Sequence, residues 1–306
     1  MVKNISWMFS SLTRLLFEFV DVFAEEKYAG NQLAVVRNAG ELRDFEMQRI
    51  ANEMHFSETS FIISDKEKDG YDVRIFTPMT ELPFAGHPTL GTAYVIRNSI
   101  VQKPVREVVL NLKVGKIPVT FEKDVDDREI LWMKQIPPTF GRTFNASVIS
   151  RLLNLNVADI NSKFPIQEVS TGTPFTIVPL NTLEAVRRAR INKDLQLELA
   201  KEARPEVVVF CPETYDKQNN LNVRVFVDLF GIPEDPATGS GNGCLAGYLS
   251  NYKFFGSDVV DVRVEQGYEI KRRSLLRLKA HTNKGNQEIE VKVGGRVIPI
   301  AAGQLL

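Results

Sequence analysis

Two segments of the sequence combine small residues with side chains that could bind or protonate a substrate. Residues 84–94 read FAGHPTLGTAY, and residues 239–249 read GSGNGCLAGYL. Each follows a Pro-containing loop and opens a predicted helix. The first turn of a helix presents unpaired backbone N–H groups and a partial positive charge, which suit a carboxylate or an oxyanion. Glycine lets a ligand approach the backbone closely. The alternative interpretation is that each segment only packs a helix tightly against a sheet.

His87 and Glu58 are the candidates for proton transfer. His87 lies inside the first segment, whereas His55 and His281 have no such context and are interpreted as surface or packing residues. Glu58 begins a predicted strand. A carboxyl group that is buried beside a ligand has a raised pKa, and it can then exchange protons near neutral pH. If Glu58 points to solvent instead, it is an ordinary residue at the end of a strand.

The two segments belong to a longer internal repeat. Four pairs of segments recur in the same order, at offsets between 142 and 155 residues: 30–36 with 172–178, 59–63 with 207–211, 73–76 with 223–226, and 85–87 with 240–242. The last pair matches Ala85-Gly86-His87 with Ser240-Gly241-Asn242. The repeat predicts two related halves, whose helix starts could hold one small anionic substrate from both sides.

The pattern of the remaining chain predicts an α+β fold with mostly antiparallel sheet and few helices. Apolar spacing predicts helices over 42–54, 146–155 and 194–203. Short runs of β-branched and aromatic residues predict strands over 17–23, 32–37, 59–63, 71–77, 107–112, 117–121, 130–134, 207–211, 222–229, 259–264, 275–279, 287–293 and 297–301. We expect a first domain over 15–135 and a second over 136–306, with the last strand a candidate to return to the first domain.

Composition argues against several classes of partner. The chain has 306 residues, and its 38 Lys and Arg balance its 38 Asp and Glu, so no charge excess favours a nucleic acid or an anionic membrane. Cys211 and Cys244 have neither disulfide-scaffold nor metal-site spacing, which indicates a reducing, cytoplasmic setting. Polar residues interrupt the apolar run within residues 1–17, which argues against a signal peptide. We interpret residues 1–14 as an N-terminal extension.

Three longer motifs resemble those of the PhzF-like (phenazine-biosynthesis-like) family. Residues 52–61 (NEMHFSETSF) resemble its E-x-x-x-S-E-T-x-F region, residues 82–93 (LPFAGHPTLGTA) its P-x-A-G-H-P-T-x-G-T-A signature, and residues 234–241 (EDPATGSG) its E-D-P-A-T-G-S-A signature. Residues 265–267 (EQG) and 293–295 (VGG) fit as well. The resemblance extends from about Phe19 to Leu305.

This resemblance implies two pseudo-symmetric diaminopimelate-epimerase-like domains, each a curved sheet around a central helix, with the active site between them. It also implies a homodimeric isomerase without metal or organic cofactor, which acts on a small unsaturated amino or hydroxy acid. Carried over residue by residue, proton transfer falls on Glu58. The other implied site residues are His87, Asp235 and Ser240, which orient the substrate, and Gly86, Gly241, Asn242 and Thr238, which bind it.

The sequence departs from related patterns in two places. Epimerases of this fold use one cysteine at each helix start, but the matched positions are Ala85 and Ser240, and Cys244 lies four residues farther on. Racemisation by two thiols is therefore disfavoured. The family's M-G-R-P-S is replaced by IKRRS at residues 270–274, in a turn that we expect to lie away from the site and to mark a changed substrate entrance. An amino-acid epimerase and a non-catalytic binding protein remain the alternatives.

Overall fold

The computed structural model describes residues 15–65, 69–199, 206–227 and 232–306. The N-terminal extension predicted for residues 1–14 lies outside them, as do residues 200–203 and 228–229 of two predicted elements. Among the described residues, no helix is both long and apolar enough to cross a membrane.

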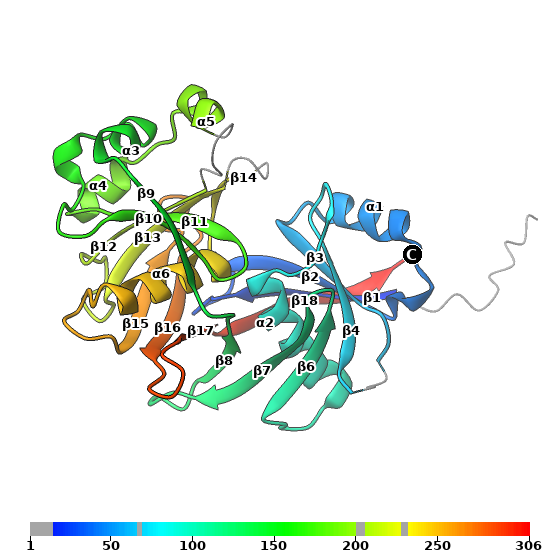
Figure 1. The fold of residues 1–306 in the computed structure, drawn as a ribbon. Coiled ribbons are helices and arrows are strands. Elements are labelled where there is room, and N and C mark those ends of the chain that lie inside the picture. Colours follow the sequence, from blue (N-terminus) through cyan, green and yellow to red (C-terminus); the bar gives the residue numbers. More distant parts are fainter. Residues whose placement is uncertain (1–14, 66–68, 200–205, 228–231) are drawn as a thin grey trace, which may run out of the picture.

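The first half follows the predicted order of elements closely (Figure 1). Its predicted helix and strands are confirmed to within three residues at their ends. The elements are β1 (Leu15–Val22), β2 (Asn31–Arg37), α1 (Asp44–Met54), β3 (Glu58–Ile62), β4 (Tyr71–Phe76), β5 (Glu81–Leu82), α2 (Gly86–Val95), β6 (Glu107–Leu112), β7 (Gly115–Lys123) and β8 (Glu129–Lys134), with short 3-10 and π turns at Ala39–Glu41 and Ile96–Val101.

The second half contains elements that local patterns did not predict, namely β9, β10, β11, α4 and β14, although the repeat matched the segment of β11 with that of β2. In order, its elements are β9 (Thr139–Phe144), α3 (Ala146–Leu152), a 3-10 turn (Val157–Asp159), β10 (Ile166–Ser170), β11 (Pro174–Pro179), α4 (Leu183–Arg188), α5 (Lys193–Leu199), β12 (Val207–Cys211), β13 (Leu221–Val227), β14 (Ile232–Asp235), α6 (Gly239–Asn251), β15 (Val260–Gln266), β16 (Ser274–Thr282), β17 (Ile289–Gly295) and β18 (Val297–Leu305).

The two halves share one sheet topology, which confirms the internal repeat. In the first half, β2 pairs with β3 in parallel, β3 with β4 in antiparallel and β4 with β6 in parallel orientation. In the second half, β11 and β12, β12 and β13, and β13 and β15 repeat this series. Two strand pairs cross between the halves, because β18 lies beside β1 and β17 beside β8. The boundary expected between residues 135 and 136 stays a prediction.

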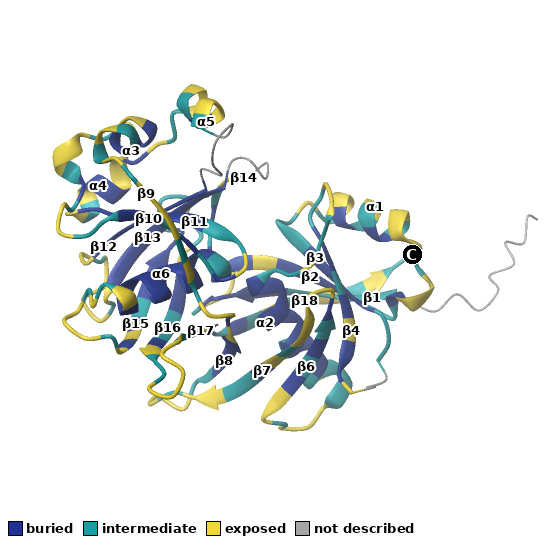
Figure 2. Cartoon of the chain, in the orientation of Figure 1, coloured by how far each residue is buried: buried dark blue, intermediate teal, exposed yellow. Residues whose placement is uncertain are grey.

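Each half wraps its sheet around one apolar helix. The helix α2 packs against β1, β2, β3, β6, β7 and β8, and α6 packs against β10, β11, β12, β15, β16 and β17. Figure 2 shows both helices as buried, and every residue of α2 except Tyr94 is buried. A helix that is apolar on all sides is stable only inside a core. Pro88 is tolerated because it lies in the first turn, where its missing N–H has no partner within the helix.

The arginine of the repeated V-R-x-F segment forms the same ion pair in both halves. Arg74 donates from Nε and Nη2 to the two carboxylate oxygens of Glu81, at 2.8 Å each. Arg224 donates in the same way to Glu234, at 2.9 and 2.7 Å. Bidentate pairs of this kind fix geometry as well as charge. Each pair ties a central strand to the short strand that leads into α2 or α6, so the repeat positions both helix starts.

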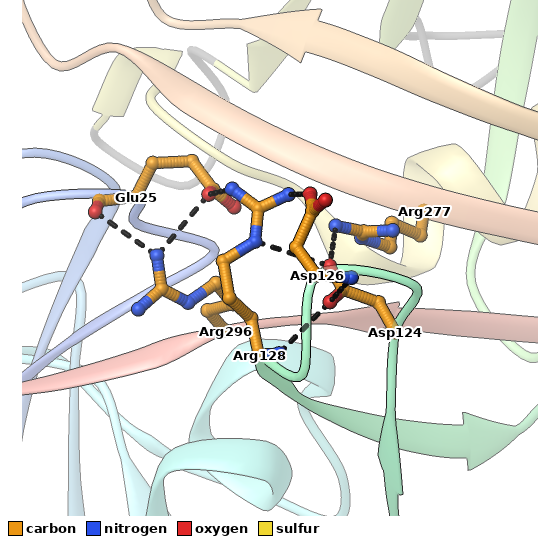
Figure 3. Close-up of polar contacts among 6 residues, drawn as sticks. All are labelled: Glu25, Asp124, Asp126, Arg128, Arg277 and Arg296. Atoms are coloured by element: carbon orange, nitrogen blue, oxygen red, sulfur yellow. Dashed lines mark hydrogen bonds and ion pairs between the residues drawn. The ribbon is translucent and has the colours of Figure 1, made fainter.

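Charged side chains make a further connection between the halves (Figure 3). Asp124, in the turn after β7, accepts hydrogen bonds from Arg128 at 3.2 Å and from Arg277 of β16 at 2.7 Å. Arg128 and Arg296 also lie 3.4 and 3.2 Å from Glu25. The loop after β1 and the turn after β7 are thereby held against β16 and the turn after β17.

Candidate active site

The starts of the two central helices touch. Gly86 and Gly239 are the first residues of α2 and α6. A Cβ atom on Gly86 would lie 3.2 Å from Gly239 Cα, and one on Gly239 would lie 3.3 Å from Gly86 Cα. Both distances are shorter than most contacts of real Cβ atoms, so glycine on both sides lets the two backbones approach without displacing each other. Two partially positive helix ends therefore converge on one region, as an anion-binding site requires.

The positions of the two helix starts show that the predicted register between the repeated segments is wrong. The N-cap residues are Ala85 and Thr238. Thr89 Oγ1 donates to the carbonyl oxygen of Ala85 at 2.7 Å, and Asn242 Nδ2 donates to that of Thr238 at 3.0 Å. The offset here is 153 residues (238 minus 85), so the predicted match of Ala85 with Ser240 is wrong by two. Several small residues recur in each segment, and local similarity could not choose among the possible registers.

The corrected register changes which residues are equivalent. His87 and Ser240 are each the second residue of their helix, and Ser240 is half-buried. The family resemblance matched the two thiols of epimerases of this fold to Ala85 and its partner in the repeat. With the corrected register that partner is Thr238, and neither residue is a cysteine. Burial raises the pKa of Cys244 to about 11 and that of Cys211 to about 12. Both thiols therefore stay protonated near neutral pH.

Glu58 and His87 meet beside this junction. Glu58 Oε2 lies 3.5 Å from His87 Nε2, and the side chains are only 16% and 5% exposed. Both atoms are buried and have no hydrogen-bond partner. Buried polar atoms in folded proteins are nearly always paired, so these two atoms mark a place where a polar group of a ligand would be stabilised.

Burial shifts the pKa values of Glu58, Asp235 and His87 away from their ordinary values. It raises the pKa of Glu58 to about 8, with a further contribution from the charge of Asp235. Burial also raises the pKa of Asp235 to about 6, although hydrogen bonds from Thr238 and Asn31 oppose the rise. The pKa of His87 falls to about 3 for the same reason. Near neutral pH, Glu58 is mostly protonated, Asp235 mostly ionised and His87 neutral, a pattern typical of acid–base sites.

Hydrogen bonds fix the Asp235 carboxylate in this arrangement. It accepts from Thr238 Oγ1 at 2.5 Å and from Asn31 Nδ2 at 2.9 Å. Gln266 Nε2 donates to the backbone oxygen of Asp235 at 2.8 Å, and Gln266 Oε1 accepts from Asn242 Nδ2 at 2.8 Å. Asn242 thus uses both amide hydrogens within the protein, because the other binds the carbonyl oxygen of Thr238.

The structure brings together most of the predicted residues and adds two. Glu58, His87 and Asp235 lie close together, and Gly86 lies at the helix contact. Gly241 is the third residue of α6, and a Cβ atom there would lie 3.2 Å from Val208 Cγ2 and 3.3 Å from Thr238 Cγ2. Asn31 and Gln266 were not predicted. Their signals in the sequence were weak: Asn31 follows Gly30 in a repeated segment, and Gln266 lies in the E-Q-G motif.

The turn that departs from the family motif is not remote from the site, which corrects our expectation. Arg272 donates to the carbonyl oxygens of Ala29 and Gly30 at 2.7 and 3.0 Å and to Asp21 Oδ1 at 2.8 Å. This turn therefore fixes the loop that ends at Asn31. The contact joins residues more than 240 positions apart, which no local pattern could reveal. Among the described residues, no group of three or more His, Cys, Asp and Glu could hold a metal ion.

Comparisons with known proteins agree with this architecture. A family model described as phenazine biosynthesis-like protein matches residues 20–303. An uncharacterized isomerase of Clostridium acetobutylicum is 32% identical, over 94% of this chain and 96% of its own. The trans-2,3-dihydro-3-hydroxyanthranilate isomerase of Pseudomonas aeruginosa is 29% identical, over 93% of this chain and 97% of its own.

Solved structures show the same fold. A PhzF-family protein of Bacillus anthracis superposes with a TM-score of 0.88 at 27% identity, over 96% of this chain and all of its own. A hydroxyproline epimerase of Agrobacterium vitis, at 10% identity, superposes with a TM-score of 0.61 over 95% of this chain and 91% of its own. The predicted α+β fold with two diaminopimelate-epimerase-like halves is thereby confirmed. The chain belongs to the phenazine biosynthesis-like family and is an enzyme of the isomerase class.

The raised pKa of Glu58 predicts how pH affects stability. Below the ordinary pKa of 4.5, Glu58 is protonated in both the folded and the unfolded chain. Between 4.5 and about 8 only the unfolded chain ionises, so the wild type loses stability relative to Glu58→Gln as pH rises. Above about 8 the difference becomes constant. A tenfold difference between the acid dissociation constants of the folded and the unfolded chain corresponds to about 1.4 kcal/mol of stability.

Urea unfolding of both proteins across this pH range measures the difference in their free energies of unfolding. Comparing the two proteins cancels the contributions of all groups that titrate equally in both. A difference that does not change between pH 4.5 and about 8 would contradict a buried, protonated Glu58.

Proposed function

We propose that this isomerase moves a proton between two carbons of a small unsaturated amino or hydroxy acid, with Glu58 as the acid–base group. The observation that carries the proposal is the pair of buried, unpartnered atoms Glu58 Oε2 and His87 Nε2, 3.5 Å apart, next to the contact between the two helix starts. A substrate carboxylate fits the positive helix ends, and its reacting carbon would then lie beside Glu58.

The proton transfer proceeds in two steps. The Glu58 carboxylate takes a proton from a carbon next to a carbonyl or conjugated group, and the electrons of the broken C–H bond enter the adjacent π system. Protonated Glu58 then returns the proton to another carbon of that system, which shifts the double bond. A pKa of about 8 suits both steps, because donor and acceptor forms are both accessible near neutral pH.

The surrounding groups have supporting roles. The helix starts stabilise the negative charge that develops on the substrate between the two steps. Neutral His87 forms a hydrogen bond with a polar group of the substrate, and Asp235 and Ser240 orient it. The overall reaction is balanced without an oxidant, a reductant or a group carrier, so no metal or organic cofactor enters it as proposed.

The observations favour this function over the two alternatives that the sequence left. An epimerase with two thiols would need cysteine where Ala85 and Thr238 stand. A binding protein without catalysis would have no need to bury two neighbouring carboxyl groups at a cost that raises the pKa of both. The raised pKa of Glu58 is costly to stability, and functional sites commonly bear such costs.

Glu58→Gln tests the role of the carboxyl group. The amide is nearly isosteric but cannot accept a proton from carbon, so we expect turnover to fall by at least a factor of about 1,000, of the order ascribed to general acid–base catalysis. Wild type and variant are incubated with a panel of small unsaturated acids that includes trans-2,3-dihydro-3-hydroxyanthranilate, and products are followed by proton NMR. Glu129→Gln, which also changes the first residue of a strand, should keep full activity.

Two outcomes would contradict the proposal. Near-wild-type turnover by folded Glu58→Gln would exclude this residue as the acid–base group. Acids that bind the wild type, shown by thermal stabilisation, but are never converted would favour the non-catalytic binding protein.

We also propose that the protein is a cytoplasmic homodimer. Both described cysteines are buried and free, which suits a reducing compartment, and a closed two-fold dimer is the commonest assembly of soluble homo-oligomers. Light scattering at micromolar concentration should give twice the 34.5 kDa of one chain. A mass equal to that of a single chain would refute the dimer.

A further inference from the structure

Asn31 joins the two halves of the site. It is the first residue of β2 in the first half, and it is 1% exposed. Its Nδ2 lies 2.9 Å from Asp235 Oδ1 and 3.0 Å from the carbonyl oxygen of Ala237, both in the second half. The same nitrogen lies 3.3 Å from His87 Nδ1. An amide nitrogen has two hydrogens, and the two shorter contacts identify their acceptors.

The loop before Asn31 is itself held in place. Arg272 binds the carbonyl oxygens of Ala29 and Gly30, and the N–H of Gly30 donates to the carbonyl oxygen of Arg273 at 2.9 Å. Asp21 accepts from Arg272 and from the N–H of Tyr28, at 2.8 Å each. The backbone that carries Asn31 towards Asp235 is therefore anchored by hydrogen bonds on both sides of the loop.

We propose that Asn31 is a positioning residue of the active site, which keeps the Asp235 carboxylate ionised and holds it in place across the junction of the two halves. A hydrogen bond donated to a carboxylate favours its charged form, and Asn31 does oppose the rise in the pKa of Asp235 that burial causes. The charge of Asp235 in turn raises the pKa of Glu58. Asn31 thus affects the pKa of Glu58 through the charge of Asp235. In this respect the inference rests on the proposed function, in which Glu58 is the acid–base group.

The other groups around Asp235 do not mask the effect of the Asn31 hydrogen bond on the pKa of Asp235. Glu58, on β3, is close enough for the charge of Asp235 to affect its pKa, and neutral His87, on α2, lies 3.3 Å from the Asn31 nitrogen that binds Asp235. Glu234, its neighbour on β14, is held by Arg224 at 2.7 Å. The remaining contacts are the uncharged Thr238 and Gln266. Loss of the Asn31 bond should therefore move the pKa of Asp235 up and that of Glu58 down, a pair of opposite shifts that a general loosening of the structure would not produce.

The experiment follows the two carboxyl groups by carbon-13 NMR in protein labelled at aspartate and glutamate, with signals assigned through Asp235→Asn and Glu58→Gln. In the wild type we expect midpoints of about 6 and about 8. In Asn31→Ala the Asp235 midpoint should rise by about one unit, and the Glu58 midpoint should fall. Asn222→Ser is the matched control. Asn222 is 0% exposed and donates from Nδ2 to buried Glu265 at 3.1 Å, so both midpoints should stay unchanged.

An Asp235 midpoint in Asn31→Ala that stays at or below the wild-type value would overturn the proposal, and so would an equal shift in the control. If Asn31→Ala fails to fold, a titration of the wild-type protein tests the proposal instead. The nitrogen-15 signal of the Asn31 amide should then titrate with the Asp235 midpoint and lose that step in Asp235→Asn, and a signal without the step would overturn the proposal.

Neither measurement uses a substrate. Failure to find a converted acid would therefore count against the proposed isomerisation alone. Unchanged midpoints would remove the role of Asn31 and leave Glu58 as the acid–base group.

Discussion

The contact between Gly86 and Gly239 is the constraint on which the rest of the structure depends. Two helices that meet end to end at this distance leave little room for a side chain on either first residue, and their like partial charges repel unless negative charge lies nearby. The Asp235 carboxylate provides part of that charge. A bound carboxylate or a developing oxyanion would provide the rest. The two helix ends therefore repel each other least when an anionic substrate lies between them.

The sheets hold this contact in place against the repulsion. Each central helix is enclosed by its own curved sheet, and the strand pairs β1–β18 and β8–β17 connect the two halves. The ion pairs of Arg74 and Arg224 fix the strands that lead into the helices. Arg272 and the network around Asp124 add contacts between residues far apart in sequence. This frame keeps most of the Glu58 side chain out of water, and the protonated form of its carboxyl group is favoured there.

Much of this could be predicted from the sequence, because the relevant signals are local or repeated. The alternation of short strands, the four repeated segments and the glycine clusters predicted two related halves and both helix starts. The register of the repeat was wrong by two residues, because Gly239 and Gly241 offer equally good local matches to Gly86. The roles of Asn31 and Arg272 could not be predicted from local sequence patterns. Their roles arise from side-chain contacts across the two halves, and nothing in the neighbouring residues indicates those partners.

The central claim is that a proton leaves one substrate carbon and reaches another through Glu58. The most direct test uses an acid that the wild type converts, labelled with deuterium at the carbon that loses its proton. The account predicts a primary isotope effect on turnover, with the deuterium found partly at the receiving carbon and otherwise in solvent, and no such transfer in Glu58→Gln. Deuterium that remains on its original carbon in the isomerised product would contradict the account.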